Sequence, residues 1–159
     1  MDVSLAAEAL TVGYGRHAVC GPVDLEIAPG ELVCLLGLIP ALGGSVRIGG
    51  TALGRLGRRD VARAVAYVPQ AHAAHFPFAV REIVVMGRTA HMGPFARPTP
   101  TDIAEAVRAL ETLGIGDLAE ADYTRISGGQ RQLALIARAL AQAAPLIVMD
   151  EPTASLDFG

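Results

Sequence analysis

The sequence predicts an α/β fold, and three observations support this class. Several short runs have the alternating or uniformly apolar pattern that is typical of strands. The middle of the chain, residues 71–126, has the spacing of amphipathic helices. A helical run over residues 129–143 then leads into an apolar strand over 146–149. With 159 residues, the chain has the size of one domain and is long enough to bury a core.

The first 70 residues predict strands, beginning with an antiparallel region. The run "PVDLEI" alternates cleanly between apolar and acidic side chains, and Pro29 and Gly30 then form a turn pair. The run "LVCLLG" is apolar without alternation, which favours a central strand covered on both faces. The expected strands are residues 5–12, 22–27, 32–37 and 45–49, together with a short run that stops at Pro69.

Two helices are expected in the middle of the chain. Residues 79–87 have helical spacing, with Gly87 placed as a C-cap. Residues 101–114 form the clearest amphipathic helix, with Thr101 as the expected N-cap and Gly114 at its end.

Composition and charge narrow the function classes. Net charge is −3 and all thirteen basic residues are arginine, so no basic run predicts a nucleic-acid surface. The most apolar stretch, residues 132–149, contains Arg138 and Pro145 and predicts a buried helix and strand rather than a spanning helix. The N-terminal residues lack the pattern of a signal peptide, and Cys20 and Cys34 make no disulfide framework, so we expect a cytoplasmic protein.

The first candidate site is "SGGQ", which stands at the expected start of the helix over 129–143. Ser127 can cap this helix, and Gly128 and Gly129 let a ligand approach the backbone closely. The helix dipole and the free N–H groups, together with Gln130, favour an anion at this point.

The second candidate site is the pair of acids that ends the apolar strand "LIVM". Acids at the carboxyl end of a central strand lie where α/β sheets bind ligands. Asp150 is placed to hold Mg²⁺, directly or through water, and Glu151 to orient or deprotonate an attacking water. In the "SLD" that follows, Ser155 and Asp157 are candidates for capping or for contacts across an interface.

Taken in order, "ISGGQ", "LIVMDE" and "SLD" resemble the ATP-binding cassette family of transport ATPases. The resemblance implies a RecA-like P-loop NTPase core with an antiparallel β subdomain and an inserted helical subdomain. The core and β subdomain would comprise residues 1–70 and 127–159 of a single, incomplete domain. Residues 71–126 would be the helical subdomain that docks on a membrane partner.

The resemblance also implies site residues, cofactors and partners. Tyr14 matches the aromatic residue that stacks on adenine, and Gln70 matches the glutamine that contacts Mg²⁺ and the attacking water. Asp157 falls in the loop that crosses the dimer interface. ATP and Mg²⁺ are the implied cofactors. The implied partners are a second ATPase subunit, transmembrane permease subunits and, indirectly, a periplasmic or surface substrate-binding protein, with the chain on the inner face of the membrane.

One motif that the resemblance requires is absent from the sequence. The family has a phosphate loop with a lysine after the strand "LVCLLG", and this chain contains no lysine. Judged from the family pattern, about fifteen residues are missing between Gly37 and Leu38. The C-terminal part with the switch histidine is also expected to be missing. We therefore expect the chain to fold poorly alone and to be inactive alone.

Several readings of function remain open. Within the family, "FPFAVREIVVMGRTAH" and "DEPTASLDFG" look most like the ATPases of importers for iron–siderophore, haem or cobalamin. The alternative is a non-catalytic helper cassette that lends its signature motif to an intact partner. A soluble relative that acts on DNA or ribosomes is disfavoured, because no coiled coil and no second cassette fit the length. His72, His75 and His91 lack the spacing of a metal site.

Overall fold

The computed structural model describes residues 5–31, 33, 40–70 and 77–150. The chain divides into two compact units, Met1–Val61 and Ala62–Gly159, and each is described by itself. Of the expected central strand over residues 32–37, only Val33 is among the described residues, so this prediction lies outside them.

The first unit is built on a four-stranded antiparallel sheet with the strand order β2-β1-β3-β4. The pairing of β1 with β2 confirms the predicted antiparallel region, and register shifts interrupt both ladders that β1 makes. The strands are β1 (Leu5–Tyr14), β2 (His17–Ile27), β3 (Ala41–Ile48) and β4 (Thr51–Ala52). They are followed by the 3-10 helix η1 (Leu53–Arg55) and by α1 (Arg58–Ala64). The sequence did not predict α1, and the boundary between the two units falls within it.

The sheet of the first unit buries little of its surface. Among its described apolar side chains, only Ala7 and Ile48 are fully buried. On β2, Leu25 and Ile27 are half-buried, while Val19 is 59% exposed. A two-sided sheet needs a covering layer to bury an apolar face. The described residues of this unit do not supply one.

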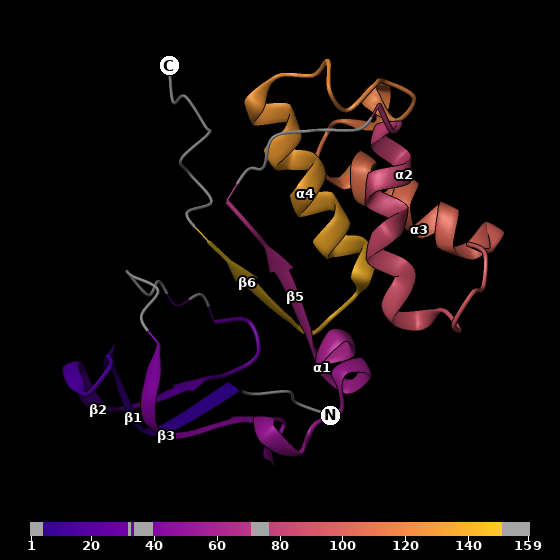
Figure 1. The fold of residues 1–159 in the computed structure, drawn as a ribbon. Coiled ribbons are helices and arrows are strands. Elements are labelled where there is room, and N and C mark those ends of the chain that lie inside the picture. The colour runs from indigo at the N-terminus through magenta and orange to yellow at the C-terminus, as the bar shows by residue number, and fades with distance from the viewer. Residues whose placement is uncertain (1–4, 32, 34–39, 71–76, 151–159) are drawn as a thin grey trace. The chain divides into compact units, whose positions relative to one another are not determined.

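The second unit combines a parallel strand pair with a group of helices (Figure 1). Strands β5 and β6 pair in register from Val65 opposite Leu146 to Val68 opposite Met149. The pairing confirms the predicted short strand before Pro69 and the strand "LIVM". The elements are β5 (Val65–Val68), α2 (Val80–Val85), η2 (Met86–His91), α3 (Pro100–Thr112), η3 (Gly116–Leu118), α4 (Gly128–Gln142) and β6 (Leu146–Met149).

Helix α4 is the central element of this unit because it packs on both sides. One of its faces contributes Ala134, Ala137 and Ala141 to a core shared with α2 and α3. The opposite face carries Leu135 and Ala139 against β5. Small alanines let neighbouring elements approach α4 closely, as Figure 1 shows for α2. A sequence that is apolar on most sides of a helix therefore marks a buried helix here.

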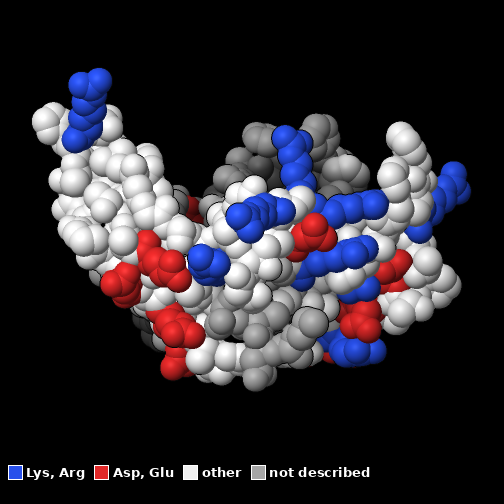
Figure 2. Space-filling view, turned by 90° about the horizontal axis from the view of Figure 1, so that it is seen from below, with Lys and Arg blue, Asp and Glu red and all other residues white. Residues whose placement is uncertain are grey.

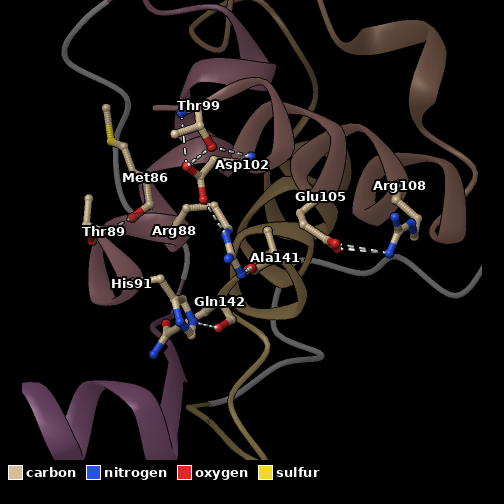
Figure 3. A network of polar contacts seen from close by, with 10 residues as sticks. All are labelled: Met86, Arg88, Thr89, His91, Thr99, Asp102, Glu105, Arg108, Ala141 and Gln142. Carbon is tan, nitrogen blue, oxygen red and sulfur yellow. Dashed lines mark hydrogen bonds and ion pairs between the residues drawn. The ribbon is translucent and has the colours of Figure 1, made fainter. Parts of the chain in front are cut away.

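One guanidinium group ties three helices together (Figure 3). Arg88 of η2 donates from Nε to Asp102 Oδ1 of α3 at 3.0 Å and from Nη1 to the Ala141 carbonyl of α4 at 2.9 Å. Both charged side chains are nearly buried. Asp102 also accepts hydrogen bonds from the backbone and the hydroxyl of Thr99. These hydrogen bonds and the Arg88 guanidinium lower the pKa of Asp102 to about 2.

Two predicted helix ends are corrected by the structure. The N-cap of α3 is Thr99 rather than Thr101, because Thr99 accepts the Asp102 N–H and Pro100 stands at the first helical position, which suits proline. Gly87 is no C-cap, because the chain continues from α2 into η2. A Cβ at Gly87 would instead collide with the Arg138 carbonyl of α4, so glycine permits this close packing.

Charge on the face drawn in Figure 2 is mixed. Arginine side chains there stand next to aspartates and glutamates instead of forming one basic field. Within the described part of the chain, no helix has the length and apolar character that crossing a bilayer requires.

Candidate functional site

The start of α4 is organised by a reciprocal pair of hydrogen bonds. The Gln130 N–H donates to Ser127 Oγ at 3.2 Å, and the Ser127 N–H donates to Gln130 Oε1 at 2.9 Å. This capping box confirms the predicted cap and fixes where the helix begins. A Cβ built on Gly128 would meet no atom within 4 Å. Packing among the described residues therefore does not require glycine there, and they leave this backbone open to an approaching group.

The carboxyl ends of β5 and β6 lie next to each other in the parallel pair. The Asp150 N–H extends the ladder by donating to the Val68 carbonyl at 3.0 Å. Gln70 follows Val68 by two residues and is exposed, while Asp150 is half-buried. The structure thus brings these two predicted site residues to the same edge of the sheet, where α/β proteins bind ligands.

Tyr67 is a neighbour of this edge that the sequence reasoning missed. Its hydroxyl donates to Asp150 Oδ2 at 3.3 Å. Desolvation and the adjacent Asp150 carboxylate raise the pKa of Tyr67. The sequence did contain a signal for this contact. Side chains alternate along β5, so Tyr67 points away from the face on which Ala66 and Val68 are buried against α4.

Tyr14 belongs to the first unit and ends strand β1. It pairs with His17 across a two-residue hairpin turn in which Gly15 has a φ of +61°. The tyrosine ring is 60% exposed, so it is available for stacking. Gly13, just before it, lies so close to β2 that a Cβ would collide with the backbone of His17 and Ala18.

The remaining predicted residues divide into two groups. Glu151, Ser155 and Asp157 lie outside the described residues, as do His72 and His75. His91 is described, and its Nε2 lies 2.7 Å from the Gln142 carbonyl of α4 (Figure 3). The contact makes His91 a structural link between η2 and α4.

The donor set near Asp150 suits Mg²⁺ only in part. Mg²⁺ in nucleotide sites usually takes one or two carboxylates or amide oxygens, with phosphate and water completing its shell. Asp150 and Gln70 supply such oxygens. No cluster of three or more His, Cys, Asp or Glu side chains occurs among the residues that the structure describes. The positive side chain that would grip the phosphates is lacking, because the whole sequence contains no lysine.

A groove of about 590 Å³ lies on the helical part of the second unit. Its apolar lining includes Phe78, Met86 and Ile103, each 40–42% exposed. Arg81, Arg97 and Glu82 also line the groove, and Arg81 forms an ion pair with Glu120, so the charge of the lining is mixed. Exposed apolar surface of this kind in a concave site is typical of a contact region for another protein.

Comparison with known proteins gives consistent matches. The pattern of the ABC transporter family matches residues 31–154. The chain is 39% identical to an uncharacterised ABC transporter ATP-binding protein of Haemophilus influenzae over 98% of this chain and 65% of the relative. It is 32% identical to the iron(3+)-hydroxamate import ATP-binding protein of Bacillus subtilis, over 98% and 63%. It is 36% identical to the hemin import ATP-binding protein of Streptomyces coelicolor, over 99% and 61%.

Solved structures agree with these sequence matches. A metal-chelate type ABC transporter in an inward-facing conformation superposes with a TM-score of 0.78 at 30% identity, over 99% of this chain and 63% of that one. A nucleotide-free ATP-binding cassette superposes with a TM-score of 0.77 at 19% identity, over 99% and 72%. The shared fold confirms the predicted fold class, a RecA-like P-loop NTPase core with an antiparallel sheet and a helical subdomain.

The alignments with these relatives are longer than the chain itself, which bears on the missing phosphate loop. The chain spans less than two thirds of the length of these three relatives. The three alignments run over 170 to 173 positions, which exceeds the 159 residues of the chain. Each relative therefore has residues inside the aligned region that this chain lacks.

The family pattern and the relatives together show that the chain belongs to the ABC transporter family.

Proposed function

We propose that the chain derives from the ATP-binding subunit of an ABC importer that carries a metal chelate, in the group of iron chelates, haem and cobalamin. Support comes from relatives whose names describe hydroxamate-iron, hemin and cobalamin import. A solved metal-chelate type transporter at 30% identity adds to it.

The observation that carries the proposal is that one end of a helix and the ends of two strands point in the same direction. Helix α4 runs back into β6, so its N-terminus and the carboxyl ends of β5 and β6 point the same way (Figure 1). An anion-binding helix start and a metal-binding strand end therefore lie on one side of the second unit. Such a surface suits phosphate groups at the helix start and a divalent cation at the strand ends.

Each predicted residue then has a proposed role. Ser127, Gly128, Gly129 and Gln130 would contact the phosphates of an ATP molecule held mainly by a second subunit, and their backbone N–H groups would supply the hydrogen bonds. Tyr14 would stack on the adenine ring, and Asp157 would contact the second subunit.

Residues at or just after the carboxyl ends of β5 and β6 would bind the metal ion and the attacking water. Asp150 would hold Mg²⁺ with help from Gln70, and the ion would neutralise phosphate charge when bound. Glu151 would orient and deprotonate the attacking water. Tyr67 would keep the Asp150 carboxylate in place through its hydrogen bond.

The missing loop limits what this chain does alone. Without the phosphate loop and its lysine, most of the contacts that hold the β- and γ-phosphates are lost. We therefore propose that the chain as written does not hydrolyse ATP by itself.

The groove on the helical part is the proposed docking site for the membrane permease. It presents apolar residues such as Phe78, Met86 and Ile103, which fits the apolar face of a short amphipathic segment. A substrate-binding protein would act only through that permease, at the inner face of the membrane.

The proposal is tested by restoring the loop. The phosphate loop and helix of the Haemophilus relative are inserted between Gly37 and Leu38, and Mg²⁺-dependent ATP hydrolysis is measured. We expect the restored protein to hydrolyse ATP and the Glu151→Gln version to lose most of this activity. A restored, folded protein that binds no Mg-ATP would refute the proposed function. Uptake assays with ferric hydroxamate, haem and cobalamin then separate the three cargoes.

A second candidate function is a helper cassette, and the complete absence of lysine favours it. Such a chain would lend its α4 start to an intact partner. The test mixes the chain with an intact relative and measures turnover. A helper raises turnover, and Gly128→Asp, which places a negative charge at the helix start, removes the increase.

A further inference from the structure

Gln132 is the buried polar side chain that the described contacts leave unexplained. It is 1% exposed, and neither its Nε2 nor its Oε1 has a hydrogen-bond partner. Buried polar side chains in folded proteins nearly always have hydrogen-bond partners, so a buried amide without one needs a physical explanation. An amide kept without partners lowers stability, which points to a role other than stability.

Helix geometry places Gln132 on the face of α4 that packs on the sheet. Residues three, four and seven positions further along a helix share a face with the first. For Gln132 these are Leu135, Ile136 and Ala139, all of which pack with the β5 residues Ala66 and Val68. The side chain therefore stands on the sheet side of α4, one turn before the contact with β5.

The level of Gln132 along the sheet follows from the other end of the helix. Gln142 Nε2 donates to the Ala62 carbonyl at 2.5 Å and to the Val65 carbonyl at 2.9 Å, so it marks the start of β5. Gln132 lies about 15 Å back along α4, at 1.5 Å per residue. The same distance along β5, at about 3.3 Å per residue, leads from Val65 to Pro69 or Gln70. Gln132 is thus level with the carboxyl ends of β5 and β6.

We propose that Gln132 is a positioning residue whose amide binds main-chain groups at the carboxyl ends of β5 and β6, beside Gln70 and Asp150, when Mg-ATP is bound. The inference rests on the proposed function. A side-chain amide has both a donor and an acceptor, so it can pair with the C=O and the N–H of a peptide group at the same time. The start of α4 and the strand ends would then be held in one arrangement, with the phosphates on one side and the metal on the other.

The matched pair for the test is Gln132→Met and Gln142→Met. Both remove a buried or half-buried amide from α4 and keep the length of the side chain. Gln142 has partners in the structure and Gln132 has none. Without nucleotide, we expect Gln132→Met to leave the urea midpoint unchanged or to raise it, and Gln142→Met to lower it. A drop for Gln132→Met as large as that for Gln142→Met overturns the proposal, because the amide would then be bonded in the resting protein, for example to a buried water.

The second measurement adds Mg-ATP to the ¹⁵N-labelled protein in which the phosphate loop has been restored, and follows amide resonances by NMR. We expect the Gln132 side-chain NH₂ signals, assigned from their loss in Gln132→Met, to shift and to exchange more slowly with solvent. In Gln132→Met, the shifts at the Gln70 and Asp150 backbone amides should be lost, while Gly128 and Gly129 still respond. Binding that leaves the Gln132 signals unchanged overturns the proposal. If no resonance of the restored protein responds to Mg-ATP, the proposed function is refuted, and the Gln132 proposal, which rests on it, is refuted with it.

Discussion

The two units of this chain are made of similarly apolar sequence, yet they bury it very differently. In the second unit, α2, α3 and α4 enclose a core with side chains such as Val80, Val84 and Leu110 fully buried. In the first unit, the described strands bury only Ala7 and Ile48 completely among their apolar side chains. Both units have regular hydrogen-bonded elements, so secondary structure alone does not produce the difference.

The difference shows that a sheet needs a second layer before its apolar residues contribute to stability. Burial contributes about 25 cal/mol per Å² of apolar surface removed from water. A helix in the second unit finds another helix or a strand to pack on, whereas strands β1 to β3 have no covering layer among the described residues. The lack of such a layer among the described residues is the physical basis for predicting that the first unit is weakly stable.

The largest expected effect comes from emptying the core of the second unit. Leu110→Ala should lower the free energy of unfolding by about 2–5 kcal/mol, because Leu110 is fully buried among helices. Val19→Ala, at an exposed position of β2, should change it by less than about 1 kcal/mol. Urea titration followed by circular dichroism measures both. Equal losses for the two variants would mean that the units share one core.

A glycine substitution should have opposite signs in the two units. Gly87→Ala places a methyl group against the Arg138 carbonyl and should cost about 1–3 kcal/mol. Gly43→Ala on β3 has free space and no positive φ, so it should be neutral or stabilise by up to about 1 kcal/mol. Thermal unfolding of the two variants tests this. A neutral Gly87→Ala would show that η2 can move away from α4.

Loss of the helix cap should have a smaller effect on stability. Ser127→Ala removes the acceptor for the Gln130 N–H and should cost about 1 kcal/mol. Ser127→Asp keeps an acceptor and should restore most of the stability. It should still weaken any interaction with phosphate, because it adds negative charge. Comparing unfolding with nucleotide binding in both variants separates capping from ligand contact.

The smallest expected effect is a pH dependence of stability that appears only in acid. The pKa of Asp102 is lowered to about 2 in the folded chain, so its ionised form stabilises the second unit above the ordinary carboxyl pKa near 4. That stability is lost as pH falls from about 4 toward 2. NMR titration of the Asp102 carboxyl should show the low value. Thr99→Val should raise it, because Thr99 provides the strongest of the hydrogen bonds involved. A titration near pH 4 in the unsubstituted chain would contradict the network of Figure 3.

Local patterns in the sequence were sufficient for most elements of the second unit. The apolar run of β6, the stripe of α3 and the cap of α4 are each encoded within a few residues, so they were predictable. Helix α1 was missed because its seven residues lead straight into β5 without a break in composition. The family itself was predictable because "ISGGQ" and "LIVMDE" are short motifs at fixed spacing.

The sequence by itself determined the fold class, most strands and helices of the second unit and the family, because periodicity and motif spacing are local properties of the chain. Only the tertiary structure decided what lies next to what. Arg88 reaches Asp102 and Ala141, and Tyr67 reaches Asp150, across separations in sequence that no local pattern records. The same holds for Gln132, whose burial without a partner depends on how α4 packs on β5. Contacts between distant segments are set by packing, and packing is a property of the whole fold.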